Sequence, residues 1–429
     1  MTAVLLISVF VFLAFAIPIG IALGGASLVT LWVGGMPDII VVQKVMSGIN
    51  HFTMIAVVFF ILAGEVMTEG GVSRKLVMLA NRMVGKLPGG LAMVTTLSAM
   101  FFGAISGSSA ATTAAIGGIM IPPMEKAGYK KDFTAAIVAA SGLLGLIIPP
   151  SGTMLLYAVI ANVSVLEMFI GGIIPGIIMG CSLMVVTFFI SKKEGYGTKQ
   201  IELEEKNDDS RAKVLFHSFM ALLSPLIIIG GIYSGIFTTT EASGVSVLYG
   251  LLVGVFVFRE LTRKRIYNAL VKTGIASAVI LFLIGAAAVF GWLMTVQQIP
   301  TMLTEFISSF TKSPQIVLLL VNIVLLIAGC LLDNVAAITM LTPVLVPLVT
   351  SFGIDPTFFG LIMIINLAIG QITPPIGMNL FVASNISGVK LDKIVANVLP
   401  FLAVLLVDLF LFTYVPDIVM VLPNLLLKK

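Results

Sequence analysis

The sequence predicts an all-α polytopic membrane protein built as an inverted repeat, with two re-entrant hairpins and two broken helices. Three observations lead to this prediction. First, 59% of the 429 residues are hydrophobic and only 10% are charged, whereas a soluble domain carries about 25% charged residues, so a soluble or disordered chain is excluded. Second, the apolar stretches are continuous, as in membrane helices, and do not alternate as in barrel strands. Third, the two halves of the chain match at a shift of 225 residues.

The apolar stretches predict a series of membrane spans. Their ranges are 3–34, 50–69, 90–124, 132–161, 169–190, 214–236, 241–258, 274–296, 315–349, 357–386 and 394–415. As single helices, 90–124 and 315–349 would each be about 52 Å long, too long for a hydrocarbon core of about 30 Å. Residues 106–109 (Ser-Gly-Ser-Ser) interrupt the first and residues 333–334 (Asp-Asn) the second. We therefore interpret both as hairpins that enter and leave the membrane on the same side.

Two further spans contain a proline pair near their middle. Pro149 and Pro150 lie in span 132–161, and their counterparts at 374–375 lie in span 357–386. Proline lacks an amide donor and clashes with the preceding helical turn. Both spans are therefore predicted to be helices that break inside the membrane.

The repeat is carried by residues that shape the backbone. The pairs matched at the shift of 225 include Pro122 and Pro347, Gly128 and Gly353, Gly145 and Gly370, Pro149-Pro150 and Pro374-Pro375, Gly152 and Gly377, Pro175 and Pro400, Ser108 and Asp333, and Ser109 and Asn334. Span 214–236 has no full counterpart, because its matching positions fall mostly before residue 1. We hypothesise that a partner chain takes the place of that helix.

The basic residues indicate that the two repeats are inverted. Loop 125–131 has three lysines and its counterpart 350–356 has none, whereas 162–168 has none and its counterpart 387–393 has two. By the positive-inside rule, the members of each pair face opposite sides of the membrane. Inverted repeats are the architecture of many secondary transporters. The cytoplasmic loops are then predicted at 70–89, 125–131, 191–214, 259–273 and 387–393, and they hold 20 of the 24 Lys and Arg residues.

The hairpin tips and helix breaks are the candidate functional segments. Irregular backbone at membrane depth is tolerated only where it lines a cavity or is buried in protein. Freed carbonyls and hydroxyls suit a monovalent cation, and half-helix N-termini suit an anion. The alternative is helix packing through small residues with no ligand. Asp333 is a carboxylate near the middle of the membrane, where charges are expensive and usually functional. It neutralises a cation, relays a proton or only caps the helix that follows.

Other functions are disfavoured by what the sequence lacks. It has no G-x-x-x-x-G-K-[ST] motif, no cluster of metal ligands and no Ser/His/Asp set, and its two histidines lie away from both breaks. We therefore expect no enzyme activity, no nucleotide cofactor and no nucleic-acid partner. The facing hairpins disfavour a continuous channel. Glu65 is interpreted as an interfacial residue near the end of its span.

Taken together, residues 103–123, 142–152, 240–243, 332–334 and 370–377 resemble the large membrane subunit (DctM type) of tripartite ATP-independent periplasmic (TRAP) transporters. The resemblance extends over essentially the whole chain. It implies an elevator-type secondary transporter in the bacterial inner membrane. It also implies a small four-helix membrane subunit (Q type), which would take the place of the missing helix. A periplasmic substrate-binding protein (P type) would deliver an organic acid, typically a C4-dicarboxylate or a sialic acid, and a sodium gradient would drive uptake.

The resemblance also implies a division between a fixed scaffold and a moving transport domain. The expected segments are first-repeat scaffold helices at 1–89, the first transport-domain hairpin, broken helix and following helix at 90–190, a cytoplasmic linker at 191–213, second-repeat scaffold helices at 214–314, the second transport-domain hairpin, broken helix and following helix at 315–415, and a C-terminal tail at 416–429.

Site residues are carried over from the family motif by motif. One Na⁺ is expected at Ser106, Ser108, Gly145 and Pro150, and a second at Asp333, Asn334, Gly370 and Thr373. The substrate would lie near Ser108, Ser109, Thr112, Asn334 and Asn379. Neither tip motif contains an arginine, so bound sodium would supply the positive charge that an acid requires. The alternative function is a stand-alone ion-coupled anion carrier that needs no binding protein.

Overall fold

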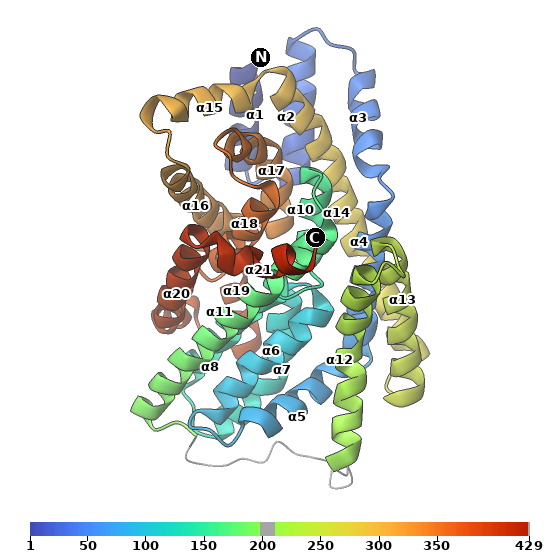
Figure 1. Cartoon of the computed structure of the whole chain (residues 1–429), viewed down its shortest axis with the longest axis vertical. Coiled ribbons are helices and arrows are strands. Elements are labelled where there is room, and N and C mark those ends of the chain that lie inside the picture. The colour runs from blue at the N-terminus through green and yellow to red at the C-terminus, as the bar shows by residue number, and fades with distance from the viewer. Residues whose placement is uncertain (198–210, 428–429) are drawn as a thin grey trace.

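The computed structural model describes residues 1–197 and 211–427, and in these ranges every regular element is a helix (Figure 1). Seven of the described helices are long and apolar enough to cross a membrane, and the number rises to nine if each of two bent pairs forms one span. The all-α, multi-pass prediction is therefore confirmed.

The first half of the chain forms helices α1 to α11. Their bounds are α1 Thr2–Ala14, α2 Ile19–Val33, α3 Ile39–Ile49, α4 Thr53–Glu69, α5 Val72–Val84, α6 Gly90–Ser106, α7 Ser109–Lys126, α8 Lys131–Gly142, α9 Leu144–Ile147, α10 Gly152–Ala161 and α11 Val165–Glu194.

The second half forms helices α12 to α21. Their bounds are α12 Arg211–Tyr233, α13 Thr239–Leu252 with a π-helical turn at Val253–Val257, α14 Arg263–Val296, α15 Ile299–Phe310, α16 Pro314–Leu331, α17 Asn334–Ser351, α18 Pro356–Gly370, α19 Met378–Ser387, α20 Leu391–Tyr414 and α21 Pro416–Leu426.

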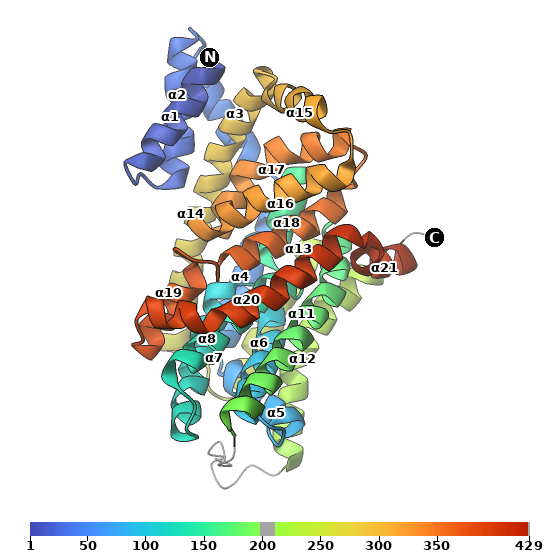
Figure 2. The ribbon, with the colours of Figure 1, turned by 90° about the vertical axis from the view of Figure 1, so that its left-hand side faces the viewer.

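The repeat predicted from the sequence is visible in these bounds. Shifted by 225 residues, α7 coincides with α17, and α5, α6, α8 and α10 fall within a few residues of α15, α16, α18 and α19. The short helices α5 and α15 lie at opposite ends of the long axis in both views (Figures 1 and 2). That placement supports the predicted inversion of one repeat relative to the other.

Both predicted hairpins turn where the sequence indicates. The first tip lies between α6 and α7, where Gly107 adopts a left-handed φ of +60° that suits glycine. The second tip lies between α16 and α17, at Leu332 and Asp333. The helices of each hairpin pack against each other. Re-entry of the hairpins into one membrane face stays a prediction.

Both predicted helix breaks are also present. In the first repeat, α8 and α9 end at Ile147 and α10 resumes at Gly152, with a bend of 43°. In the second repeat, α18 ends at Gly370 and α19 begins only at Met378. Each break contains its proline pair, as the missing amide donors require.

The first predicted span differs from the structure. Residues 3–34 form two short helices, α1 and α2, which pack against each other and bring Met1 beside Gly34. Pro18 is the N-cap of α2, a position where a missing amide costs little. The span predicted at 50–69 is preceded by a further helix, α3, which meets α4 at an angle of 58°.

Helices also occupy segments that were predicted as loops. Helix α5 lies within 70–89, and α14 begins at Arg263 within 259–273. Their charged residues reduced the apolar signal without preventing helix formation. Residues 416–429, expected as a tail, contain α21, which packs on α11. Of the expected linker at 191–213, residues 198–210 lie outside the described residues.

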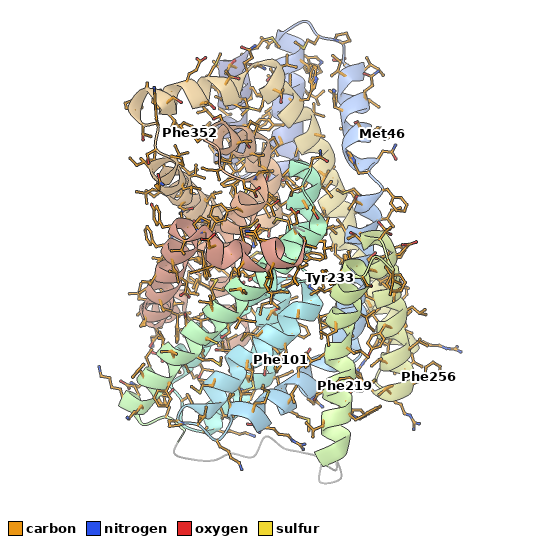
Figure 3. All side chains as sticks on the ribbon, viewed as in Figure 1. Met46, Phe101, Phe219, Tyr233, Phe256 and Phe352 are labelled. Atoms are coloured by element: carbon orange, nitrogen blue, oxygen red, sulfur yellow. The ribbon has the colours of Figure 1, made fainter. Side chains whose placement is uncertain are left out.

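Apolar side chains cover the outside of the molecule as well as its core. Met46, Phe219 and Phe256 project outward from three different helices (Figure 3), and Phe256 is 68% exposed. In contrast, nearly every residue of α8 and α18 is buried, so the two broken helices lie at the centre of the fold. This distribution fits a protein surrounded by lipid, because lipid tails solvate apolar surface.

The two repeats interlock around that centre. Helix α10 of the first repeat packs on α17 of the second, and α19 of the second repeat packs on α7 of the first. The buried Tyr157 of α10 donates a hydrogen bond of 2.6 Å to the carbonyl of Pro356 at the start of α18. Each repeat therefore completes the core of the other.

Candidate functional site

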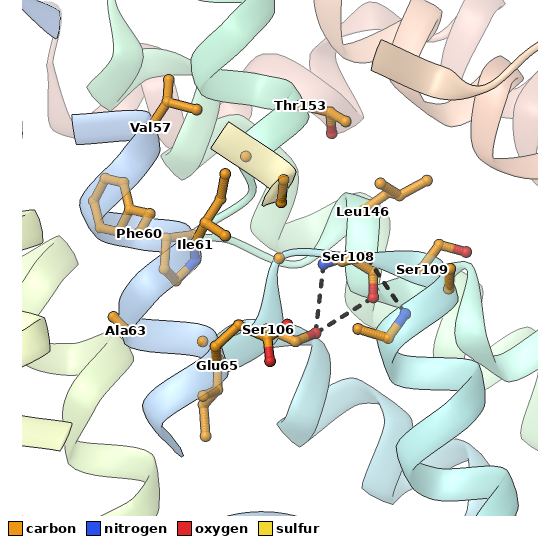
Figure 4. A pocket seen from close by; sticks show the side chains of 18 of the residues that line it. Val57, Phe60, Ile61, Ala63, Glu65, Ser106, Ser108, Ser109, Leu146 and Thr153 are labelled. Carbon is orange, nitrogen blue, oxygen red and sulfur yellow. Dashed lines mark hydrogen bonds between the residues drawn. The ribbon is translucent and has the colours of Figure 1, made fainter. Parts of the chain in front are cut away.

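A cavity of about 310 Å³ lies where the two tips meet the two breaks. Its wall comprises parts of α4, residues 104–111 of the first tip, Pro150 and Gly152 of the first break, residues 333–335 of the second tip, and Gln371 and Met378 of the second break, with smaller contributions from α12 and α14. Figure 4 shows part of this wall, with α4 on one side and the first tip beside it. A volume of this size is sufficient for a small organic ligand.

The first tip is a compact turn of hydroxyl side chains. Ser108 is the N-cap of α7 and accepts a long hydrogen bond of 3.4 Å from the amide of Ala111. The Ser106 hydroxyl lies 2.9 Å from that of Thr112, which also donates to the Ser108 carbonyl at 2.7 Å. These contacts gather several oxygens around one turn, and Figure 4 shows those that involve Ser106 and Ser108.

The first tip also abuts the first break, and this contact requires glycine. A β-carbon on Gly145 would overlap the Thr112 hydroxyl and lie 2.6 Å from the Ser108 carbonyl oxygen. A β-carbon on Gly107 would lie 3.1 Å from the Pro150 carbonyl oxygen. Tip and break thus approach backbone to backbone, and the four residues predicted for the first sodium site lie together.

Asn379 connects the first tip to the second break. Its side-chain oxygen accepts a 2.7 Å hydrogen bond from Ser109, and its side-chain nitrogen donates to the Ala139 carbonyl at 3.2 Å. Its backbone amide donates to the Gln371 carbonyl at 3.1 Å. The side chain is fully buried and lies behind the cavity wall. Its predicted role in substrate binding stays a prediction, and the contact present is with Ser109.

Replacing Ser109 with alanine is expected to loosen this connection. Among the described residues Ser109 is the one side-chain donor to the Asn379 oxygen, and its loss costs about 1–3 kcal/mol. We expect a lower unfolding temperature in detergent and slower transport. Ser351→Ala, at the far end of the opposite hairpin, is the matched control and should leave transport unchanged. Wild-type stability and transport of the Ser109 variant would contradict this interpretation.

The second tip presents one carboxylate to the cavity. Asp333 is the N-cap of α17, and its carboxylate accepts a hydrogen bond of 3.0 Å from the amide of Val335. The side chain is exposed and lines the cavity. Asn334 follows and is only 3% exposed, and within the described residues neither atom of its side-chain amide has a hydrogen-bond partner.

The second break packs against the end of α16. A β-carbon on Gly370 would lie 2.5 Å from the Gly329 carbonyl carbon. The Cys330 thiol lies 3.1 Å from the Thr373 carbonyl, to which it donates, and the Thr373 hydroxyl donates to the Ile369 carbonyl. The structure thus places Gly370 and Thr373 beside the last turn before Asp333.

The predicted site residues fall into two groups. Those that line the cavity are Ser106, Ser108, Ser109, Pro150, Asp333 and Asn334. Those that lie behind the wall and hold it in place are Thr112, Gly145, Gly370, Thr373 and Asn379. The structure brings both groups to one region of the fold, where tips and breaks meet.

Glu65 and Gln371 line the cavity but were not among the predicted site residues. Glu65 reaches the cavity from α4, where Gly64 packs closely on the Ser106 carbonyl, and its interpretation as an interfacial residue stays a prediction. Gln371 lines it from the second break, directly after Gly370. The position of Gln371 inside a predicted break was a usable signal. The position of Glu65 depends on how α4 packs, which no local pattern encodes.

The cavity is acidic. Its lining among the described residues includes the carboxylates of Glu65 and Asp333 but no Lys, Arg or His. Lys272 of α14, outside the lining, approaches Glu65 at 3.8 Å and pairs with Glu69 at 2.7 Å. The positive charge of Lys272 is therefore already engaged at the edge of the site.

A repeated all-helical fold with an acidic, hydroxyl-rich cavity between its tips and breaks is that of a multi-pass membrane transport protein. The family described as "Tripartite ATP-independent periplasmic transporter, DctM component" matches residues 6–418. The chain belongs to this family. It is therefore a transporter permease subunit and not an enzyme.

Similar proteins include permeases of several organisms. The chain is 43% identical to the isethionate TRAP transporter permease protein DctMQ of Oleidesulfovibrio alaskensis, over 95% of this chain and 64% of that protein. It thus spans about two thirds of that relative's length. It is 41% identical to the C4-dicarboxylate large permease DctM of Pseudomonas aeruginosa, over 89% and 88%, and 37% identical to the sialic acid large permease SiaM of Vibrio cholerae, over 90% and 89%.

The fold is also found among solved structures. The crystal structure of the Alcanivorax borkumensis YdaH transporter superimposes with a TM-score of 0.62 over 87% of each chain. The sequence identity is only 15%, so this likeness concerns the fold alone.

Proposed function

We propose that this chain is the transport subunit of a sodium-coupled secondary importer of organic acids in the bacterial inner membrane. The observation that carries the proposal is the charge of the cavity, which presents two carboxylates and no basic side chain among its described lining residues. An organic anion is repelled by such a site unless a cation enters with it. Hydroxyl and carbonyl oxygens are suitable ligands for a hard monovalent cation.

We propose two sodium sites, one in each repeat. The first comprises Ser106, Ser108, Gly145 and Pro150, where the first tip meets the first break, and the packing of these segments supports it. The second lies at the equivalent place in the other repeat, where Gly370 and Thr373 abut the last turn before Asp333 and Asn334. At the first site the hydroxyls of Ser106 and Ser108 lie beside the break that contains Gly145 and Pro150. At the second site the Gly370 and Thr373 carbonyls already accept hydrogen bonds, from the Thr373 amide and the Cys330 thiol, so a sodium ion there would use their remaining lone pairs.

We propose that the substrate lies between the two tips. Ser108, Ser109 and Asn334 line the cavity there. The names of the relatives at 36–43% identity include isethionate, C4-dicarboxylates, sialic acid and 2,3-diketo-L-gulonate, all of which are organic acids. In the elevator mechanism that we propose, residues 90–190 and 315–415 carry the cavity across the membrane against the remaining scaffold helices.

Two partners complete the proposed importer. The relative named DctMQ is longer than this chain, which matches 64% of it, and a separate small membrane subunit of the Q type would supply the remainder. A periplasmic binding protein of the P type would deliver the acid, in accord with the tripartite family description.

The coupling ion is tested by reconstitution. We expect uptake in proteoliposomes that contain this chain, the small subunit and the loaded binding protein only when a sodium gradient is applied. The physical reason is that sodium supplies the charge that the cavity lacks. Uptake is measured with the radiolabelled acid under inward sodium and inward potassium gradients of equal size.

Two results would change the proposal. Equal uptake in potassium and sodium would remove sodium coupling. Uptake at full rate without the binding protein would replace the tripartite importer with the stand-alone ion-coupled carrier.

A further inference from the structure

Two residues that line the cavity carry buried side-chain amides with unsatisfied hydrogen bonds. Asn334 at the second tip is 3% exposed and Gln371 at the second break is 2% exposed. Both line the cavity. Within the described residues, the Asn334 side-chain nitrogen and oxygen and the Gln371 side-chain oxygen have no hydrogen-bond partner.

Buried amides of this kind are expected to form hydrogen bonds with a ligand that enters the cavity. The large majority of buried polar atoms in native proteins are hydrogen-bonded, and an unmatched one is costly. The backbone of Gln371 is fixed on both sides, since its amide donates to the Leu367 and Ala368 carbonyls at 3.2 Å and its carbonyl accepts from Asn379 at 3.1 Å. The backbone at Gln371 is therefore held in place, and among the described residues its side-chain oxygen has no donor.

The unpartnered atoms of the two amides require different hydrogen-bond partners. The Asn334 nitrogen is a donor, so it suits an oxygen of an ionised acid group. The Gln371 oxygen is an acceptor only, and an ionised acid group has no proton to donate to it. A ligand that carries a hydroxyl in addition to its acid group satisfies both atoms.

We propose that Gln371 selects hydroxylated organic acids, with its side-chain oxygen accepting a hydrogen bond from the substrate hydroxyl while the Asn334 amide donates to the acid group. This inference rests on the proposed function, because it names the substrate class of the same cavity. An acid without the hydroxyl would leave the Gln371 oxygen buried and unpaired, which is the arrangement that produces strong rejection of an analogue.

The test measures binding to the permease without the binding protein, so that the selectivity belongs to this chain. The purified full chain with its small membrane subunit is heated in detergent and sodium with matched acids, malate against succinate and isethionate against ethanesulfonate. The concentration that raises the unfolding temperature half-maximally is compared within each pair. In at least one pair, we expect the hydroxylated acid to raise the unfolding temperature half-maximally at a concentration roughly 5- to 150-fold lower than the acid without the hydroxyl.

Three variants assign the selectivity to Gln371. The selectivity is the ratio of the half-maximal concentration of the acid without the hydroxyl to that of the hydroxylated acid. Gln371→Met keeps an unbranched side chain but removes the acceptor, so this ratio should fall to about one. Gln371→Glu keeps an acceptor oxygen, so the ratio should persist even if both acids bind more weakly. Gln297→Met is the matched control, because Gln297 also has an unpartnered amide among the described residues but lies outside the cavity, and the wild-type ratio is expected there.

The outcomes separate this inference from the function on which it rests. A wild-type ratio near one overturns it, as does an unchanged ratio in Gln371→Met or a lost ratio in Gln371→Glu. A sodium ion that occupies the Gln371 oxygen would give the first of these results. If no acid of either kind stabilises the complex in sodium, the proposed function itself fails and the inference falls with it.

Discussion

Replacing Asp333 with asparagine is expected to remove sodium-driven uptake while leaving the fold intact. Asparagine caps a helix as well as aspartate does, so the hydrogen bond from the Val335 amide is kept. Only the charge is lost from the cavity. Loss of an outer-shell partner alone weakens metal binding by about 10- to 100-fold, so we expect loss of this carboxylate to raise the half-saturating sodium concentration by about 100-fold or more.

The measurement is the initial uptake rate as a function of external sodium. Asp355→Asn is the matched control, because Asp355 also caps a helix, through the amide of Phe358 at 2.8 Å, and lies outside the cavity wall. The control should keep the wild-type sodium dependence. A wild-type sodium curve in the Asp333 variant would reduce Asp333 to a helix cap.

Replacing Gly370 with alanine is expected to stop transport by forcing the second break away from α16. The new β-carbon would lie 2.5 Å from the Gly329 carbonyl carbon and 2.6 Å from its α-carbon. No side chain can rotate to relieve this overlap, because both contacts are with backbone. Overpacking of this kind costs about 1–3 kcal/mol, and it displaces the segment that presents Thr373 and Gln371.

Gly118→Ala provides the control for this substitution. Gly118 lies in α7 with no atom within 4 Å of the position of a new β-carbon. Alanine there should be neutral, or stabilising by up to about 1 kcal/mol through helix propensity. Unfolding temperature in detergent and uptake are measured for both variants. A Gly370 variant that is as stable and active as the wild type would show that the break and α16 are free to separate.

Much of the fold could be predicted because the decisive residues act on the backbone. The proline pairs break helices wherever they lie, and Gly107 permits a turn that other residues disfavour. The predictions failed where hydropathy averaged over a window does not show a short turn or a charged helix. Residues 14–17 are apolar and only Pro18 marks the break, so the turn between α1 and α2 left little trace in hydropathy. Helix α5 is amphipathic and charged, so the same measure assigned it to a loop.

Most residues of the site could be predicted from the sequence, but their roles in it could not. Ser106, Ser108 and Asp333 were identified because polar residues inside an apolar segment are expensive. The distinction between residues that face the cavity and residues that support it was not predictable, because it depends on tertiary contacts. Asn379 illustrates this, since its amide is occupied by Ser109 and Ala139 from the other repeat.

Because the repeats interlock, some contacts of the first repeat can form only after the second repeat has been synthesised. Helix α7 is covered by α19, which follows it by about 250 residues. At about 5–20 residues per second, translation separates the two by roughly 13 to 50 s. During that interval the surface of α7 that later contacts α19 has no partner from the second repeat. A truncated chain that ends before α19 would therefore keep the contacts of α7 with α6 and α8 but lack those with α19.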